Sequence, residues 1–253
     1  MGSFPRLTPA HFASPGLCFA KPLSGLAKRR KQPERYIREA KEFIASSGFH
    51  LPPFAFWSPG EWETRGSEYR EIRDNQLGWD LTDFGGGDYE KTGLFLFTLR
   101  NGGCRSPANK KTYAEKIMVC RPGQVTPYHY HQSKMEDIIN RGGNGRLCVT
   151  LYGSKGPHEL DTHSPVPAAV DGRNFSVPAG ETLRLSPGES VTLFQGVFHQ
   201  FWAEGATLLI GEVSMVNDDH RDNFFLSAPG RFPRIVEDEE PLHLLVGDYG
   251  NLA

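Results

Sequence analysis

The sequence lacks long apolar runs, paired cysteines and an excess of charge of either sign. Apolar stretches such as Leu94–Phe97 are far shorter than the roughly 20 residues that cross a bilayer, so we expect no membrane-spanning segment. With 28 basic and 30 acidic residues the formal net charge is −2, which argues against nucleic acid as a partner. The four cysteines form no C-x-x-C pair and no regular framework, which excludes a disulfide scaffold and favours a reducing, cytoplasmic location; they are Cys18, Cys104, Cys120 and Cys148.

Glycine and proline, in contrast, are abundant, with 28 and 19 of the 253 residues, and such a chain has many turns. After Leu77, short β-prone runs alternate with turns that contain glycine or proline, a spacing typical of an antiparallel sandwich or barrel. We therefore predict a mainly β domain over residues 77–253, ending in a C-terminal tail whose acidic run 237–240 is solvated. The predicted strands are Leu94–Leu99, Ala114–Cys120, Leu147–Tyr152, Thr182–Leu185, Ser190–Phe194 and Thr207–Val213.

Residues 1–33 differ in composition from the rest of the chain. They contain six lysines or arginines and five prolines but no acidic residue, so we predict a disordered basic extension. An acid-free basic leader also resembles an organelle transit peptide, although this one lacks an amphipathic arginine face and the apolar core of a secretory signal. A start codon placed too far upstream would give the same pattern.

Residues 34–76 form a predicted helical segment that packs on the β domain, so that one structural domain begins at residue 34. Apolar residues recur at spacings of three and four from residue 36 to residue 44, which predicts an amphipathic helix. A second helical stretch is predicted from Ser58 to Asp74, where Ser58 and Glu61 have the spacing of a capping box. Gly66 lowers the helix propensity of this second stretch.

The most informative segment contains two histidines separated by one residue. Side chains on a strand alternate between faces, so His129 and His131 point the same way, about 7 Å apart, and both can reach one metal ion. Glu136 follows after a turn with an anionic oxygen, and His199 on a predicted strand further along the chain completes the set. Three imidazoles and one carboxylate leave two positions open on an octahedral ion, which points to catalysis. These donors suit Mn²⁺, Fe²⁺, Co²⁺ or Ni²⁺, with Zn²⁺ as a further alternative.

The spacing of these residues resembles the two sequence motifs of the cupins. The pattern Gly123-x5-His129-x-His131-x4-Glu136-x6-Gly143 resembles the first motif, and Gly188-x5-Phe194-x-Gly196-x2-His199 resembles the second. The second motif departs from the usual pattern, because Phe194 stands in place of a proline and Ala203 in place of an asparagine. The resemblance implies a mainly β fold, the double-stranded β-helix or jelly-roll barrel, with a metal inside its mouth.

A more specific resemblance runs from about Arg38 to Asp238, to the D-lyxose isomerase family of cupin sugar isomerases. It implies reversible conversion of D-lyxose to D-xylulose, and often of D-mannose to D-fructose, with a manganese ion and a homodimer. Residues 1–33 lie outside it. The segments that carry it are Phe49–Phe54, Leu77–Asp80, Leu96–Gly102, Tyr113–Met118, Gly123–Pro127, Glu136–Gly143, Leu183–Ser190 and Gly211–Asp219.

Two residues outside the ligand set are candidates for acid–base catalysis. Lys116 lies on the predicted strand just before the histidine strand, and Glu212 interrupts an apolar strand where a core side chain is expected. A carboxylate inside such a strand needs a partner or a function. The alternatives are an exposed strand lysine for Lys116 and, for Glu212, a group that orients a ligand histidine.

Polar residues near these strands are candidates for binding sugar hydroxyls. Arg141, Asp218 and Asp222 are the predicted substrate contacts, and Asp219 and His220 belong to the same polar set. Each of them could equally belong to a solvated loop.

Two other functions fit the same residues. Three histidines and one glutamate in a cupin also support an Fe²⁺ dioxygenase, in which O₂ occupies the open positions. The third interpretation is a non-catalytic, metal-dependent sugar-binding module attached to a partner through its basic tail.

Overall fold

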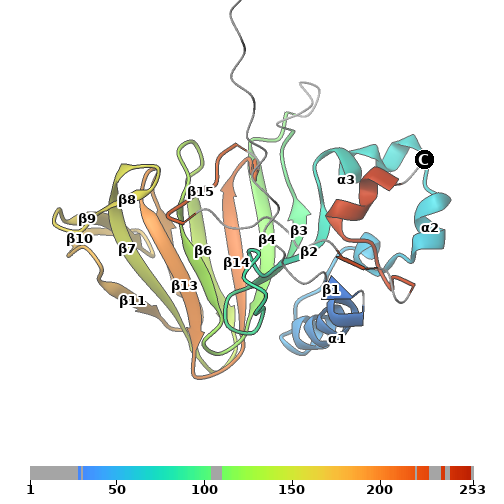
Figure 1. Cartoon of the computed structure of the whole chain (residues 1–253), viewed down its shortest axis with the longest axis horizontal. Helices are drawn as coiled ribbons and strands as arrows, with labels where there is room; N and C mark the ends of the chain where they lie inside the picture. Colours follow the sequence, from blue (N-terminus) through green and yellow to red (C-terminus); the bar gives the residue numbers. More distant parts are fainter. Residues whose placement is uncertain are drawn as a thin grey trace, which may run out of the picture.

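The computed structural model describes residues 28–29, 31–103, 110–219, 221–227, 235–236 and 240–251, and its strands form two antiparallel sheets that curl around a shared core (Figure 1). The larger sheet has eight strands in the order β10-β9-β12-β6-β14-β4-β3-β2. In chain order, its strands are β2 (Gly78–Thr82), β3 (Leu94–Arg100), β4 (Tyr113–Cys120), β6 (Glu136–Gly142), β9 (Val166–Val170), β10 (Arg173–Val177), β12 (Ser190–Leu193) and β14 (Leu208–Met215).

The smaller sheet has the order β11-β7-β13-β5-β15, with β8 paired on β7. Its strands are β5 (Val125–Tyr130), β7 (Arg146–Gly156), β8 (Glu159–Asp161), β11 (Thr182–Leu185), β13 (Phe198–Glu204) and β15 (Phe224–Phe225). Two further short strands, β1 (Lys28–Arg29) and β16 (Ile235–Val236), pair in parallel. All six predicted strands are present, and the mainly β, cupin-type fold is confirmed.

The core of the barrel lies between the two sheets because successive side chains of a strand face opposite sides. On β14, Leu208 and Ile210 enter the barrel core, whereas Leu209 packs on the other face of the sheet. The barrel core is fully apolar toward β7, where Leu147, Val149 and Leu151 are completely buried. Burying such side chains stabilises the fold by about 1.5–3 kcal/mol each.

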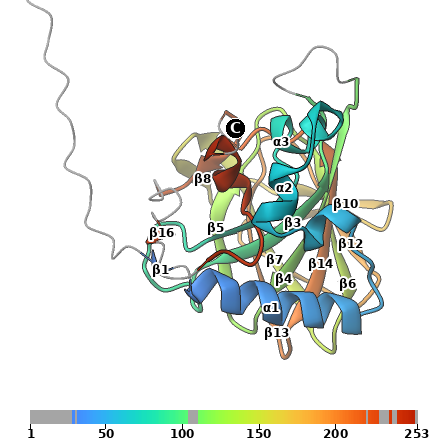
Figure 2. The same ribbon diagram turned by 90° about the vertical axis from the view of Figure 1, so that its right-hand side faces the viewer.

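The helical segment covers the outer face of the larger sheet. Helix α1 (Lys31–Ser46) crosses this face (Figure 2), and its buried side chains Ile37 and Ile44 share a core with Phe97 of β3. The helix begins three residues before the predicted position, with Pro33 in its first turn, where a proline costs no hydrogen bond.

The second predicted helix is interrupted. A capping box between Ser58 and Glu61 starts α2 (Pro59–Glu63), as predicted, but the backbone is extended at Gly66. The chain then forms a short 3₁₀ helix, η2 (Ser67–Tyr69), which is followed directly by a short α-helix, α3 (Arg70–Asp74). The low helix propensity of glycine accounts for the break. A separate 3₁₀ turn, η1 (Pro53–Phe56), precedes α2.

The end of the chain packs beside β2. The 3₁₀ helix η3 (Val246–Asn251) brings the Tyr249 hydroxyl to the carbonyl oxygen of Leu77, to which it donates at 2.6 Å. A side chain at Gly78 would collide with this hydroxyl. Within the described residues, no helix is long and apolar enough to cross a membrane. The predicted extension lies outside the described part as far as residue 27, and so does most of the predicted acidic run.

Candidate metal and catalytic site

Three histidines converge inside the mouth of the barrel. The pairing of β13 with β5 sets His199 opposite His129, and His131 follows immediately after β5. The candidate ligand atoms of the three rings all lie within 4.8 Å of one another. All three side chains are buried, with 8% or less of each residue exposed. The alternation predicted from the His-x-His spacing therefore holds.

Backbone carbonyl groups fix the tautomer of each ring. The Nδ1 atoms of His129, His131 and His199 lie 2.8, 2.8 and 3.1 Å from the carbonyl oxygens of Pro127, Asp222 and Val197, respectively. Because a carbonyl oxygen only accepts, each Nδ1 carries a proton, which leaves Nε2 as the atom of each ring that could bind a metal ion. Metal-binding histidines are oriented in this way in many proteins.

The surroundings of His129 and His199 suit metal binding. Burial and the neighbouring rings of His199 and His131 lower the pKa of His129 well below its usual value, so its ring is neutral. The Nε2 atom of His199 is buried without a hydrogen-bond partner among the described residues. A buried polar atom of this kind carries a desolvation cost, which a bound cation would offset. The donor set therefore fits a divalent metal ion.

Glu136 supplies a carboxylate beside the histidines. Its Oε1 atom lies 3.4 Å from Nε2 of His131 and 3.3 Å from Nε2 of His199. Its Oε2 atom lies 2.6 Å from Nζ of Lys134. Burial opposes ionisation, but Lys134 and His131 together hold the pKa of Glu136 well below its usual range. The structure thus brings all four predicted ligands together, with the carboxylate ionised.

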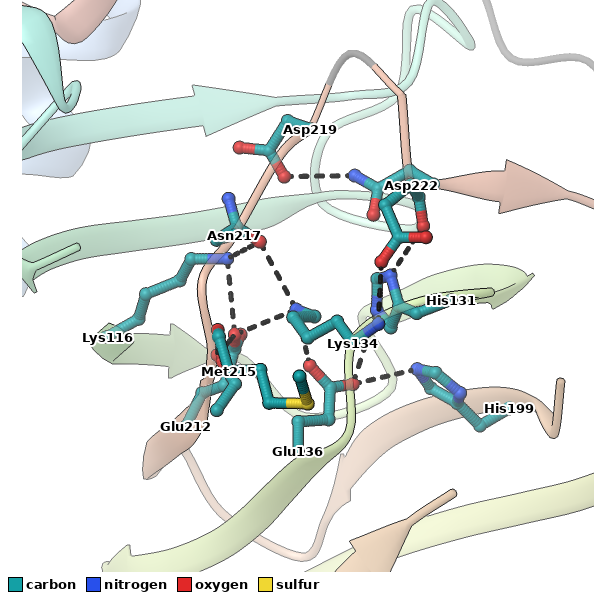
Figure 3. A network of polar contacts seen from close by, with 12 residues as sticks. Lys116, His131, Lys134, Glu136, His199, Glu212, Met215, Asn217, Asp219 and Asp222 are labelled. Atoms are coloured by element: carbon teal, nitrogen blue, oxygen red, sulfur yellow. Dashed lines mark hydrogen bonds and ion pairs between the residues drawn. The ribbon is translucent and has the colours of Figure 1, made fainter. Parts of the chain in front are cut away.

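Lys134 is a central residue that sequence reasoning missed. Figure 3 shows its ammonium group between Glu136 and Glu212, with Nζ 2.9 Å from Oε1 of Glu212 and 3.2 Å from Oδ1 of Asn217. Burial would lower its pKa, but the two carboxylates outweigh burial and raise it, so the side chain is protonated. Its inward direction follows from the strand alternation around exposed Met135, which was a usable signal in the sequence.

The two predicted acid–base residues meet beside this lysine. Glu212 on β14 is paired with Lys116 on β4, and the Lys116 Nζ lies 3.3 Å from Oε1 of Glu212. Both residues are 5% exposed, so Lys116 is not an exposed strand lysine. Ser214 also donates to Oε1 of Glu212, at 3.0 Å. Among the described residues, the contacts of Glu212 are with lysines and serine and not with a ligand histidine.

Asp222 acts as a clamp, because its side chain binds the backbone of the segment between His131 and Glu136. Its Oδ1 atom accepts from the amides of Gln132 and Ser133 at 3.0 and 2.8 Å, and its Oδ2 atom accepts from the amide of Lys134 at 2.8 Å. Its own carbonyl oxygen accepts from His131. The buried carboxylate is therefore engaged with backbone amides that lie between the predicted ligands His131 and Glu136.

The other predicted substrate contacts lie at different places. Arg141 is exposed on the outer face of the larger sheet, where its side chain lies over Gly211, and the structure does not bring it to the histidines. Side chains on a strand alternate between its two faces, and Arg141 lies five residues after inward-facing Glu136, an odd number. Its side chain therefore faces outward. Asp218 lies in the turn after β14 and accepts the amide of Asp222 at its carbonyl oxygen. His220 lies outside the described residues.

An aromatic wall borders the histidines on the side of β15. The ring of Phe225 stacks on His129 with centroids 5.3 Å apart, and Phe84 lies 5.7 Å from Phe225. Phe84 has a positive φ of 52°, which is unusual for a bulky residue. Its amide donates to Thr82, and the side chain of buried Asp83 accepts from two amides of the following glycines. These contacts hold the strained turn beside the site.

A β-barrel that holds three inward histidines and a carboxylate has a cupin-like fold and a group of side chains that could bind a metal ion. The sequence model of the D-lyxose isomerase family matches residues 28–249. The chain therefore belongs to the D-lyxose isomerase family, and it is a sugar isomerase.

Individual relatives agree with this assignment. A D-lyxose/D-mannose isomerase of Serratia proteamaculans is 45% identical over 216 residues, which cover 84% of this chain and 94% of the relative. A D-lyxose ketol-isomerase of Cohnella laeviribosi is 28% identical and covers 69% of this chain and 100% of its own. Among solved structures, the L-ribose isomerase of Cellulomonas parahominis with L-ribose has a TM-score of 0.54 at 16% identity, covering 85% of this chain and 99% of that one. This last similarity supports the fold alone.

Proposed function

We propose that this protein is a metal-dependent aldose–ketose isomerase that interconverts D-lyxose and D-xylulose, and also D-mannose and D-fructose. The supporting observation is one buried group of side chains: three histidines and the Glu136 carboxylate on one side, and Glu212 with two lysines on the other. The relatives named for D-lyxose and D-mannose support the choice of sugars.

His129, His131, His199 and Glu136 are the proposed metal ligands, and Mn²⁺ is the proposed ion, with Co²⁺, Fe²⁺, Ni²⁺ and Zn²⁺ as alternatives. When bound, such an ion supplies Lewis-acid polarisation of the sugar carbonyl and hydroxyl. The protein contributes rings oriented by backbone carbonyls, a neutral His129 and an ionised carboxylate before any ion arrives.

Glu212 is the proposed base that moves a proton between the first two carbons of the sugar. In the aldose-to-ketose direction, the C2–H bond breaks and a C1–H bond forms, while a proton passes from O2 to O1. The described contacts of Glu212 all engage Oε1, so Oε2 has no such partner among the described residues and is free to take the proton. General acid–base groups of this kind contribute about 10²–10⁴-fold to turnover.

The two lysines are proposed to hold and supply positive charge at this carboxylate. Lys134 is protonated and its three N–H groups face Glu136, Glu212 and Asn217, so it acts as a fixed positive charge between the two carboxylates. Lys116 approaches Glu212 from the neighbouring strand. Because these ammonium groups are in place before the reaction, they stabilise the negative charge that develops on the sugar during proton transfer.

The hydrogen could instead move between the two carbons as a hydride, and then Glu212 would serve only to move the proton between the oxygens. Isomerisation in tritiated water separates the two routes. Proton transfer through Glu212 is expected to place label at C1 or C2, whereas complete absence of carbon-bound label would show hydride transfer.

The walls around the site match the amphiphilic nature of a sugar. Phe225 and Phe84 offer an apolar surface for its C–H groups, and Asp218, in the turn after β14, is a proposed contact for its hydroxyls. We propose that Asp222 does not contact the sugar but positions His131 and Glu136, because its carboxylate holds the backbone between them. Arg141 is not part of the proposed site.

The decisive experiment is a metal-reconstitution panel. The protein is stripped with a chelator, each of the five ions is restored singly, and ketose formation is measured from lyxose, mannose, xylose and ribose. Turnover of lyxose and mannose with Mn²⁺ is the expected result. Oxygen uptake with Fe²⁺ and no isomerisation would indicate a dioxygenase, and sugar binding without any turnover would indicate a binding module; either would overturn the proposal.

We also propose a homodimer in the cytoplasm. The family resemblance supports the dimer, and the free, buried cysteines Cys120 and Cys148 suit a reducing compartment. Light scattering after size exclusion, and cell fractionation, test these two statements.

A further inference from the structure

The segment Leu96–Gly102 carries part of the family resemblance, yet the proposed reaction uses none of its residues. Asn101 stands just after β3, is 5% exposed, and makes a two-point contact with the backbone of Asn217. Its Oδ1 atom accepts from the Asn217 amide at 3.0 Å, and its Nδ2 atom donates to the Asn217 carbonyl oxygen at 3.0 Å. One side chain thus fixes both backbone polar groups of a single residue in another segment.

Asn217 in turn contacts both lysines of the site. Its Oδ1 atom accepts from Lys116 at 2.8 Å and from Lys134 at 3.2 Å, as Figure 3 shows. Both ammonium groups also contact Oε1 of Glu212, so the amide oxygen is a neutral acceptor between two cations and one anion. A change in the position of this oxygen would move two charges relative to Glu212.

Asn101 is itself held from the other side. Asn75 at the end of α3 donates from Nδ2 to the Asn101 carbonyl oxygen at 3.0 Å, and Asn101 Nδ2 lies 3.4 Å from the Asn75 carbonyl oxygen. Next to it, a side chain at Gly102 would collide with the Lys111 carbonyl and the Val216 side chain, so the segment after β3 packs closely on both neighbours. These contacts and the bonds to Asn75 hold Asn101 beside Asn217.

We propose that Asn101 is a positioning residue for the isomerase reaction: it fixes Asn217 so that Asn217 holds Lys116 and Lys134 at Glu212. This inference rests on the proposed function and deepens it. Asn101 does not touch the site itself, and its effect passes through one residue. Displacing groups that support an active site typically costs about 10–100-fold in activity.

The test compares Asn101→Leu with a matched control, Asn140→Leu. Asn140 is also a fully buried amide on the barrel side of the larger sheet, and it donates to the carbonyl oxygens of Gly145 and Leu185, away from the lysines. For Asn101→Leu, kcat on D-lyxose is expected to fall about 10–100-fold at unchanged metal content, with KM changed much less. For Asn140→Leu, kcat is expected to stay near that of the wild type even if its Tm falls equally.

A double-mutant cycle shows whether the effect passes through Asn217. If it does, Asn101→Leu combined with Asn217→Ala should have the kcat of Asn217→Ala alone, to within about twofold. Two results would overturn the proposal. One is a double variant whose loss in kcat is the product of the losses in the two single variants, and the other is a kcat of Asn101→Leu equal to that of Asn140→Leu. Asn101→Asp keeps the acceptor for the Asn217 amide, so it should retain part of the activity, and it replaces Asn101→Leu in the cycle if that variant does not fold. Failure of the wild type to isomerise any sugar would count against the proposed function instead.

Discussion

Replacing Lys134 by methionine tests the electrostatics of the site without any substrate. The side chain is 3% exposed and lies 2.6 Å from Glu136 and 2.9 Å from Glu212. At an effective dielectric constant of about 20, each contact corresponds to roughly 6 kcal/mol of attraction, most of which the desolvation of the charges offsets. Removing the cation leaves two carboxylates buried without it, and breaking a buried ion pair in this way costs about 3–5 kcal/mol.

The assay is thermal unfolding of the metal-free protein. In a chain of this size, 1 kcal/mol shifts Tm by about 2–4 °C, so Tm of Lys134→Met should fall by roughly 6–20 °C. The control is Lys155→Met, because Lys155 is 45% exposed and lies 3.9 Å from Asp161; a surface pair of this kind contributes less than about 1 kcal/mol. Saturating Mn²⁺ should narrow the difference between Lys134→Met and the wild type, because a cation beside Glu136 replaces part of the lost charge.

The pH dependence of this difference has a definite sign. In the wild type the pKa of Glu136 is depressed, so its contribution to stability is present above its unfolded pKa of about 4.5 and is lost as the pH falls through the folded value. Without Lys134, burial should raise the pKa of Glu136, and the variant should lose stability as the pH rises. The difference in Tm should therefore grow from pH 5 to pH 8. A metal-free Tm within about 2 °C of the control at pH 8 would refute this account of the site.

Three further predictions concern other residues of the barrel. His199→Ala should lose bound metal and turnover together while circular dichroism shows a folded barrel; full metal content by mass spectrometry would remove His199 from the ligand set. Glu212→Gln should keep its metal and lose about 10²–10⁴-fold in kcat, and near-normal turnover would exclude it from proton transfer. Burial and the neighbouring Asp219 carboxylate raise the pKa of Asp80 to about 8, so the wild type should lose stability as the pH rises from 4 to 8. Asp80→Asn removes this loss, so its Tm advantage over the wild type should grow between pH 5 and pH 8; an advantage that does not change with pH would contradict the raised pKa.

Six of the strands could be predicted because alternation and turn residues are local properties of the chain. The break at Gly66 could be predicted only in part. The low helix propensity of glycine is evident from the sequence, but the return to helix at Arg70 depends on packing. The two-residue strand β15 was not predicted. It has no periodicity of its own and exists because Phe224 and Phe225 pair with β5.

The metal ligands could be predicted for the same reason, since the direction of His129 and His131 follows from their spacing on one strand. Lys134 was missed because a lysine in a turn is usually exposed, although its spacing of two residues from Glu136 was a signal that both side chains face the same way. Arg141 was chosen for its charge, although its parity relative to Glu136 already predicts that it faces outward. The clamp formed by Asp222 joins segments about 90 residues apart, a relationship that no local pattern contains.

That clamp has a consequence for how an ion would enter the protein. Because the amides of three consecutive residues are already tied to Asp222, the loop between the histidines and Glu136 has little conformational freedom left to lose on metal capture. The ion would then bind to a preformed site, without folding coupled to binding. Removal of the ion with a chelator would leave the barrel folded, and the metal-free protein would bind the ion again without refolding.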